Sequence, residues 1–154
     1  MGTRSAIGYK TPEGKIRAKY SHYDGYVAGA GKTLQEHYTQ ARKIAQMVEL
    51  GDQSYMDKEI FPMPGSGHSF NTPEEGVTIF YGRDRGETGQ EFKVFSTLAK
   101  AQDYFEGSWC EYLYVFKYKK SDDYQSGEWH FKKPGGRWKK LAPALAKLKA
   151  EECA

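Results

Sequence analysis

The fold is decided near the start of the chain by residues 5–21, SAIGYKTPEGKIRAKYS, which predict a β-hairpin. Pro12 and Gly14 stand at the second and fourth positions of a four-residue turn, where a type I turn favours them. Apolar side chains alternate on both sides of this turn, as in strands with one face turned to a core, at Ile7, Tyr9, Ile16, Ala18 and Tyr20. We therefore expect the chain to open with two antiparallel strands.

The segment from about Lys32 to Leu50 predicts a helix. Its apolar residues recur at steps of four and three, which aligns them on one helical stripe: Leu34, Tyr38, Ala41, Ala45 and Val48. Gly51 is a natural C-terminal stop. We expect the stripe to pack against a sheet that includes residues 111–118.

Further elements follow along the chain. Residues 52–76 predict a long loop because Pro and Gly interrupt them, and residues 82–87 predict a charged loop. Between these loops we expect a strand at 77–81. After them we expect a helix that is capped by Ser96 or Thr97 and runs to about Phe105, and then a strand at 111–118. The chain should end with a hairpin formed by 128–132 and 137–141 and with a helix from Pro143, whose Leu145 and Leu148 face inward. In the strand at 111–118, Tyr112, Tyr114, Phe116 and Tyr118 share one face, and Leu113 and Val115 share the other.

Hairpins mixed with helices indicate an α+β fold. We expect a single domain over residues 1–154, with a largely antiparallel sheet, two main helices and a short C-terminal helix. A chain of 154 residues with 15% aromatic side chains can bury a core of ordinary size.

The charge is unevenly distributed. The whole chain carries a formal charge of +3, but residues 117–149 hold ten basic and three acidic residues, a net +7 that leaves −4 elsewhere. Aromatic and basic side chains interleave in the second hairpin: Trp129, Phe131 and Trp138 with Lys132, Lys133, Arg137 and Lys139. Such a pattern fits nucleic-acid binding, and cross-strand packing explains the same residues without a ligand.

Cysteine usage and hydropathy indicate the compartment. Cys110 and Cys153 are too few for a disulfide framework, and we expect both to be free thiols. No apolar run approaches the roughly 20 residues that cross a bilayer, and the first ten residues lack an apolar signal-peptide centre. We expect a cytoplasmic protein with no membrane association.

Residues 29–33, Gly-Ala-Gly-Lys-Thr, invite comparison with a nucleotide-binding P-loop. That motif needs a glycine five positions before Gly31, where this chain has Tyr26, so the spacing does not fit. A weaker prediction remains, because free backbone N–H groups at Gly31 and Lys32, at the start of a helix, suit an anion. An ordinary flexible entry into the helix is the alternative.

His22 and Asp24 stand two positions apart and point the same way on an extended segment. Such a pair can orient an imidazole for acid–base chemistry, or it can simply fix a turn at Asp24-Gly25. The four histidines are scattered without paired cysteines, which disfavours zinc. We assign no catalytic residue and expect no cofactor.

Two arginines, Arg83 and Arg85, stand in the charged loop. Their planar guanidinium groups suit phosphate and carboxylate, and a solvated internal ion pair with Asp84 is the alternative. We expect Arg83 and Arg85 to join Arg4, His22, Asp24, Tyr26, Gly31 and Lys32 in one anion-binding pocket at an end of the sheet.

Four segments together resemble a group of small uncharacterised proteins of tailed bacteriophages. They are Thr3-Arg4-Ser5-x-Ile7, His22-Tyr23-Asp24-Gly25-Tyr26, Leu50-Gly51-Asp52, and Gly76-Val77-Thr78-Ile79 continuing to Arg83-Asp84-Arg85-Gly86-Glu87. The resemblance covers about residues 3–118, and members often carry Trp in place of Tyr23 and Pro in place of Val27. It implies a viral protein acting in a host cytoplasm.

From these observations we expect a phage accessory protein that binds and neutralises a host component. The target is a small anionic nucleotide-like ligand or a host protein. One alternative is an enzyme acting on nucleotides or nucleic acid with His22 as the acid–base group. Another is a nucleic-acid-binding module that uses the basic C-terminal third.

Overall fold

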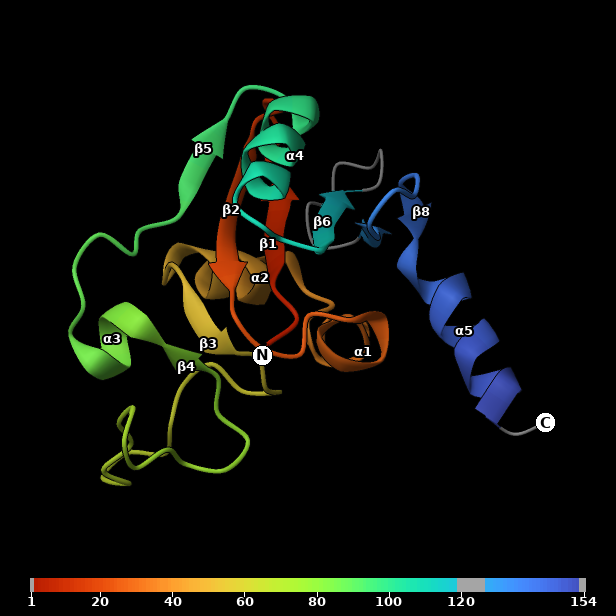
Figure 1. Ribbon diagram of the computed structural model, residues 1–154. Helices are drawn as coiled ribbons and strands as arrows, with labels where there is room; N and C mark the ends of the chain where they lie inside the picture. The colour runs from red at the N-terminus through yellow and green to blue at the C-terminus, as the bar shows by residue number, and fades with distance from the viewer. Residues whose placement is uncertain (1, 119–126, 153–154) are drawn as a thin grey trace.

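Strand β1 (Ser5–Lys10) lies at the centre of a mixed sheet, between β2 (Ile16–Ser21) and β6 (Tyr112–Tyr118). The computed structural model describes residues 2–118 and 127–152 (Figure 1). The hairpin is confirmed, because β1 and β2 pair antiparallel and Gly14 N donates to Thr11 O at 2.9 Å across the turn. Gly8 lets the strands approach, since a Cβ there would lie 2.5 Å from the carbonyl oxygen of Arg17.

The sheet of the described residues has the order β4-β3-β2-β1-β6-β7-β8. Its other strands are β3 (Gln53–Tyr55), β4 (Ile79–Phe80), β7 (Gly127–Lys132), β8 (Lys139–Lys140) and β5 (Lys93–Phe95), which pairs with the opposite end of β2 from β3. The β1–β6 and β2–β3 pairs are parallel, and the other named pairs are antiparallel. The α+β class is confirmed, with a sheet that is mixed.

Helices cover both faces of this sheet (Figure 1). On one face, Tyr114 and Phe116 share a buried cluster with α1 (Lys32–His37) and α2 (Ala41–Glu49). On the other, Leu113 and Val115 pack with α4 (Leu98–Gly107). The alternation predicted for β6 is confirmed, and it gives the protein a core on each side of the central strands.

The predicted helix from Lys32 to Leu50 is interrupted. α1 ends at Tyr38 (φ −122°, ψ 68°), and α2 starts after the extended residue Gln40. The carbonyl oxygen of Tyr38 accepts a hydrogen bond of 2.8 Å from Nε1 of Trp129. In a continuous helix, the same oxygen would accept from the backbone N–H four residues later. The predicted stripe is nevertheless inward: Leu34, Tyr38, Ala41 and Val48 are buried, and Ala45 is partly buried.

The second predicted helix begins as expected. The side chain of Thr97 accepts a hydrogen bond from Lys100 N and caps α4, which continues two residues beyond Phe105. The predicted loop at 82–87 is wrong, because Tyr81–Arg85 forms the one-turn helix α3. Oδ2 of Asp84 accepts a hydrogen bond from Phe80 N, and Gly86 (φ 74°) ends the turn.

The C-terminal helix α5 (Leu141–Glu152) is longer than predicted and starts before Pro143. Leu141 is fully buried and Leu145 packs against the core, but Leu148 is 36% exposed, so its predicted inward position is wrong. α5 packs on β7 and on the turn that precedes α1, at the edge of the molecule away from α3 and β5 (Figure 1).

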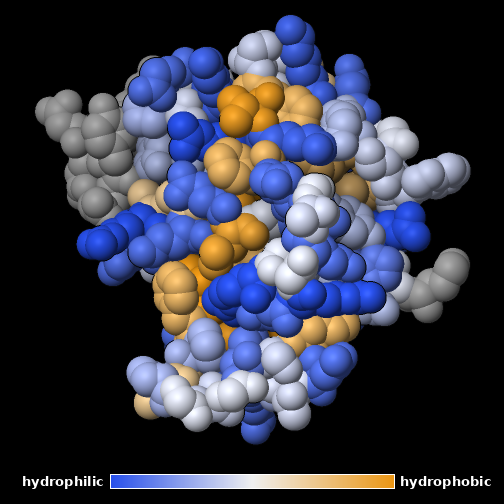
Figure 2. Space-filling view, turned by 90° about the vertical axis from the view of Figure 1, so that its left-hand side faces the viewer, coloured by the Kyte–Doolittle hydropathy of each residue, from blue (hydrophilic) through white to orange (hydrophobic). Residues whose placement is uncertain are grey.

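The opposite side of the molecule, which carries β5 and α3, has no single hydrophobic area. Figure 2 shows separate hydrophobic patches there, divided by hydrophilic side chains. Cys110 is a buried free thiol, whereas Cys153 and the charged residues Lys119, Lys120, Asp122 and Asp123 lie outside the described residues. No helix in the described ranges is long and apolar enough to cross a membrane.

Candidate functional site

Two cavities share the start of the helical turn η1 (Val27–Gly31), and Tyr26 and Ala28 line both. The larger, which we name the lysine groove, has a volume of about 680 Å³ and lies between η1, the edge strands and α5. The side chains of interest that line it are Tyr26, Tyr112, Phe131, Lys133, Lys139, Lys140, Lys147 and Glu151. The smaller, which we name the polar cavity, has a volume of about 310 Å³. Both volumes lie in the range of small-molecule sites.

The lysine groove is positively charged. It is lined by four lysines and one carboxylate, that of Glu151. Lys140 pairs with Glu128 at 3.4 Å, whereas Lys133, Lys139 and Lys147 form no ion pair with any described residue. Three ammonium groups therefore remain available to an anion beside an aromatic surface.

The groove is built by contacts between distant segments. Tyr114 Oη donates a hydrogen bond of 2.6 Å to Gly25 O, which ties the residue before Tyr26 to the central sheet. Gly31 packs closely under the start of α5, since a Cβ there would lie 3.3 Å from Leu141 Cδ1 and from the ring of Tyr114. One wall of the groove is thus fixed to β6, and the other belongs to α5.

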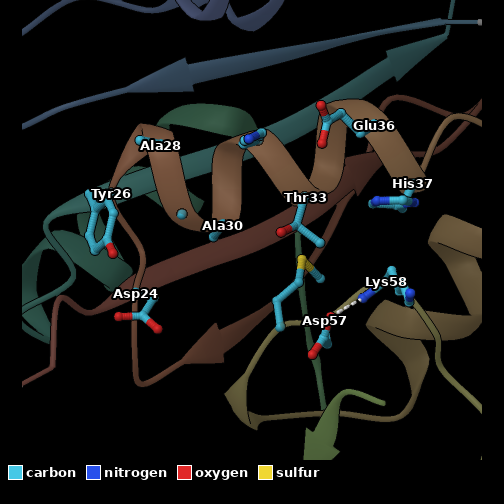
Figure 3. Close-up of a pocket in the computed structure, with 12 residues that line it drawn as sticks. Asp24, Tyr26, Ala28, Ala30, Thr33, Glu36, His37, Asp57 and Lys58 are labelled. Atoms are coloured by element: carbon cyan, nitrogen blue, oxygen red, sulfur yellow. Dashed lines mark hydrogen bonds between the residues drawn. The ribbon is translucent and has the colours of Figure 1, made fainter. Parts of the chain in front are cut away.

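The polar cavity lies between η1, α1 and residues 56–58 (Figure 3). Its charged and polar lining includes Asp24, Tyr26, Lys32, Thr33, Glu36, His37, Asp57 and Lys58. Asp24 has φ 56°, a left-handed conformation that Asp tolerates better than most residues. Ala30 N holds it there by donating to Asp24 O at 2.8 Å.

The predicted free backbone donors at the start of the first helix are not formed. Residues 27–31 wind into a helical turn in which Gly29 and Gly31 donate to Tyr26 O, at 2.9 and 3.5 Å. Lys32 N donates to the carbonyl groups of Gly29 and Val27. Gly31 is buried and lines neither cavity, while Lys32 contributes its side chain to the polar cavity.

Arg4 and His22 lie together, apart from both cavities. Nδ1 of His22 is 2.5 Å from Oη of Tyr20, and its ring packs edge-on against Tyr23. Burial lowers the pKa of His22, and the positive charge of Arg4 lowers it further. Both effects favour the neutral imidazole, which contacts Tyr20 and Tyr23, and His22 lines neither cavity.

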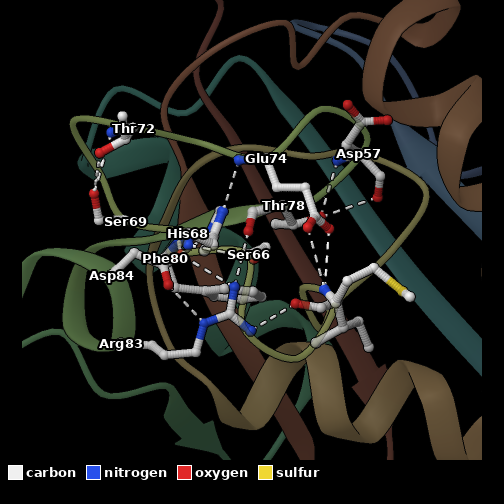
Figure 4. Close-up of polar contacts among 12 residues, drawn as sticks. Asp57, Ser66, His68, Ser69, Thr72, Glu74, Thr78, Phe80, Arg83 and Asp84 are labelled. Atoms are coloured by element: carbon white, nitrogen blue, oxygen red, sulfur yellow. Dashed lines mark hydrogen bonds and ion pairs between the residues drawn. The ribbon is translucent and has the colours of Figure 1, made fainter.

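Arg83 is bound within the fold (Figure 4). Its guanidinium donates to Asp84 Oδ1 at 2.7 Å, to Ile60 O at 2.5 Å and to Thr78 O at 3.1 Å. Arg85 instead pairs with Glu87 at 3.4 Å and lies over the ring of Phe70. The two arginines line neither cavity, so the cavities unite only Asp24, Tyr26 and Lys32 of the eight predicted residues.

Asp84 is the centre of this network. Nε2 of the buried His68 lies 3.2 Å from Asp84 Oδ2 without the alignment of a hydrogen bond, and Glu74 N donates to His68 Nδ1. Burial raises the pKa of Asp84, but hydrogen bonds from Arg83 and Phe80 N, together with the imidazole of His68 beside it, outweigh burial and keep the pKa below its usual value. These contacts attach the long loop to α3, which is a structural role.

The aromatic residues of the second hairpin are packed rather than exposed. Trp129 and Phe131 are 3% and 4% exposed, and Trp138 Nε1 donates to Gln102 Oε1 of α4 at 3.0 Å. Lys132 pairs with Glu106 at 3.2 Å. Cross-strand and helix packing therefore explain these residues, whereas Tyr26, which lines the lysine groove, is 42% exposed.

Sequence reasoning missed the groove residues Tyr112, Lys133, Lys140 and Lys147 as members of one site. The excess of basic residues after position 117 was the one signal, since all three of these lysines belong to it. In the described part of the chain no group of three or more His, Cys, Asp or Glu side chains is arranged to hold a metal ion.

Comparison of the chain with protein-family models, with curated proteins and with solved structures finds no match.

Proposed function

We propose that the protein binds a small, anionic, nucleotide-like ligand in the lysine groove. The observation that supports this most is the combination of four lysines with the exposed ring of Tyr26 around one cavity of about 680 Å³. A nucleotide offers the matching pair of groups, a chain of phosphates and a planar base.

The lysines suit the phosphates. Lys139 and Lys140 lie on β8, Lys133 precedes them in the turn, and Lys147 faces them from α5. Charge-assisted hydrogen bonds from ammonium groups to phosphate are roughly twice as strong as neutral ones. Because the lysines come from two elements, a ligand with several phosphates would engage both sides of the groove.

Tyr26 suits the base. Tyr26 lines both cavities, and its ring is 42% exposed. A Tyr ring has a large apolar surface that is usually buried, so its exposed face is available for a ligand to cover. A base stacked on an aromatic side chain contributes about 1–3 kcal/mol to binding. The groove thus supplies both the charge and the stacking surface that a nucleotide requires.

The biological setting follows from the resemblance to tailed-phage proteins. In an infected host cytoplasm, a binder of this kind would neutralise a host nucleotide signal by holding it. This proposal needs no catalytic group, in keeping with the position of His22 away from both cavities.

Isothermal titration calorimetry with adenosine, AMP, ADP and ATP tests the proposal. Affinity should rise with the number of phosphates, and Lys147→Gln should weaken ATP binding by about tenfold or more. Lys149→Gln is the matched control, because Lys149 lies on the same helix and does not line the groove. Equal affinity of Lys147→Gln and wild type for ATP, or no binding of any of the four compounds, would contradict the proposal.

Single-stranded nucleic acid is the second candidate, because lysines spaced over β8 and α5 can neutralise successive phosphates of one strand. Titration with oligonucleotides of two to ten residues separates the two candidates. Affinity that increases with length and falls steeply with salt favours a nucleic acid. Affinity that does not exceed that of ATP favours the small ligand.

A further inference from the structure

The polar cavity adjoins the lysine groove through Tyr26 and Ala28, which line both. A ligand bound beside Tyr26 in the lysine groove therefore has a second cavity directly next to it. Neither Asp24 nor Asp57 is assigned to the lysine groove, so the second cavity offers the ligand different chemistry.

The two cavities differ in charge. The polar cavity is lined by three carboxylates and two lysines together with His37, so charges of both signs nearly cancel, whereas the lysine groove is strongly positive. A cavity with acceptors and donors and little net charge suits an uncharged polyhydroxyl group better than a phosphate. The phosphates and the hydroxyl groups of one ligand would thus separate between the two cavities.

Asp57 is held rigidly in the polar cavity. Its carbonyl oxygen accepts hydrogen bonds from Tyr38 Oη at 2.7 Å and from Thr78 Oγ1 at 2.9 Å, and its N–H donates to the same Thr78 oxygen at 2.9 Å. Oδ1 accepts from Lys58 N at 2.8 Å. Three of these bonds fix the backbone of Asp57, and the fourth orients its carboxylate, so the side chain is positioned before a ligand arrives.

Asp24 and Asp57 retain acceptor capacity. Neither carboxylate forms an ion pair with a described residue. Both residues line the polar cavity, and Figure 3 shows Asp24 below Tyr26 and Asp57 beside Lys58, with Thr33 above Asp57. Carboxylates accept hydrogen bonds from neighbouring sugar hydroxyls, as they do from the ribose 2′-hydroxyl in dinucleotide-binding folds.

We infer that the polar cavity receives the 2′- and 3′-hydroxyl groups of a nucleotide whose 5′-phosphates lie in the lysine groove. The ribose, which links the base to the phosphates, then lies at the boundary that Tyr26 and Ala28 form between the two cavities. The ligand is then a ribonucleotide, and Asp24 and Asp57 select it over its deoxy counterpart. This inference rests on the proposed function, because it requires the phosphates to bind the lysines.

Binding of ATP, 2′-deoxy-ATP and inorganic triphosphate to the full chain tests the inference. The wild type should prefer ATP over 2′-deoxy-ATP by about tenfold or more, since a site built around a hydroxyl leaves its acceptors unpaired when the hydroxyl is missing. Asp57→Ala should lose this preference and keep its affinity for inorganic triphosphate. Glu59→Ala, which alters a neighbouring carboxylate outside both cavities, should behave as wild type.

Asp24→Asn is a second variant in case Asp57→Ala disturbs the fold, because Asn also tolerates the left-handed backbone at position 24. It should reduce the preference for ATP over 2′-deoxy-ATP with an unchanged melting temperature. Equal wild-type affinities for ATP and 2′-deoxy-ATP, or equal losses for both ligands in the variants, would overturn the inference and leave the lysine groove standing. Absence of ATP and triphosphate binding by the wild type would overturn the proposed function itself.

Discussion

The phenol of Tyr114 donates a buried hydrogen bond of 2.6 Å to the carbonyl oxygen of Gly25, a residue 89 positions earlier in the chain. Burial raises the pKa of Tyr114, so its hydroxyl stays protonated and available as a donor. The bond fixes the backbone directly before Tyr26 to the middle of the sheet. The position of the aromatic ring in the candidate site therefore depends on a core residue that no ligand touches.

Tyr114→Phe should destabilise the protein by about 1–3 kcal/mol, because it leaves a buried carbonyl group without its partner. It should also weaken ATP binding, since Tyr26 loses its anchor. Urea denaturation measures the change in stability, and isothermal titration calorimetry measures the change in ATP affinity. Tyr23→Phe is the control, because Tyr23 is 44% exposed, and it should leave both quantities unchanged. If Tyr114→Phe were as stable as the wild type, the hydrogen bond would not contribute to the stability of the fold.

Asp84→Asn should lower stability at pH 7 by about 2 kcal/mol, because charged hydrogen bonds to Arg83 are lost. The pKa of Asp84 is lowered in the folded state, so its contribution is present above the ordinary value of about 3.9 and disappears as pH falls through the folded pKa. The difference between the wild type and the variant should therefore shrink below about pH 4.

Urea denaturation between pH 7 and pH 2.5 measures this difference. Asp103→Asn, an exposed substitution on α4, serves as the control. A difference for Asp84→Asn that is constant over the whole pH range would show that the folded state does not favour its carboxylate.

Lys19 should make stability depend on pH in the alkaline range. Its side chain is buried, with Nζ 2.5 Å from Met47 O and 4.3 Å from the centre of the Phe80 ring. Burial lowers the pKa of Lys19 far below its usual value, with Asp52 opposing the shift and Arg83 adding to it. Between that lowered pKa and about 10.4 the unfolded chain binds more protons than the folded one, so stability rises with pH.

The wild type should accordingly gain stability relative to Lys19→Met as pH increases from 7 to about 10. Lys15→Met, which changes an exposed lysine in the first turn, should follow the wild type instead. Parallel stability curves for the wild type and Lys19→Met would refute a lowered pKa. Thermal denaturation at several pH values provides the curves.

Local sequence patterns predicted the elements whose signals are local. The turn at Pro12 and Gly14, the Thr97 cap and the alternation along residues 112–118 depend on neighbours a few positions away, and the structure confirms them. The break after Tyr38 was not predictable in this way, because it depends on Trp129, which is 91 positions distant. Strands β3 and β5 were missed because three residues give too short a pattern.

In the candidate site, too, residues with a local sequence signal were predicted, and those that depend on distant contacts were not. Asp24, Tyr26 and Lys32 were predicted from a polar, glycine-rich segment, and they do line a cavity. For Arg83 the sequence left anion binding and an ion pair with Asp84 open; the structure shows the ion pair, together with bonds to Ile60 and Thr78 that only the fold reveals. The lysine groove was not predicted as a unit, since it forms where the start of η1 meets a helix more than a hundred positions later.

A crystal structure of the protein grown with ATP would show directly whether the lysine groove binds a nucleotide. We predict phosphate oxygens within hydrogen-bonding distance of Nζ of Lys139 and Lys147, with the adenine ring against Tyr26. ATP bound at another surface, with the lysine groove left empty, would contradict it.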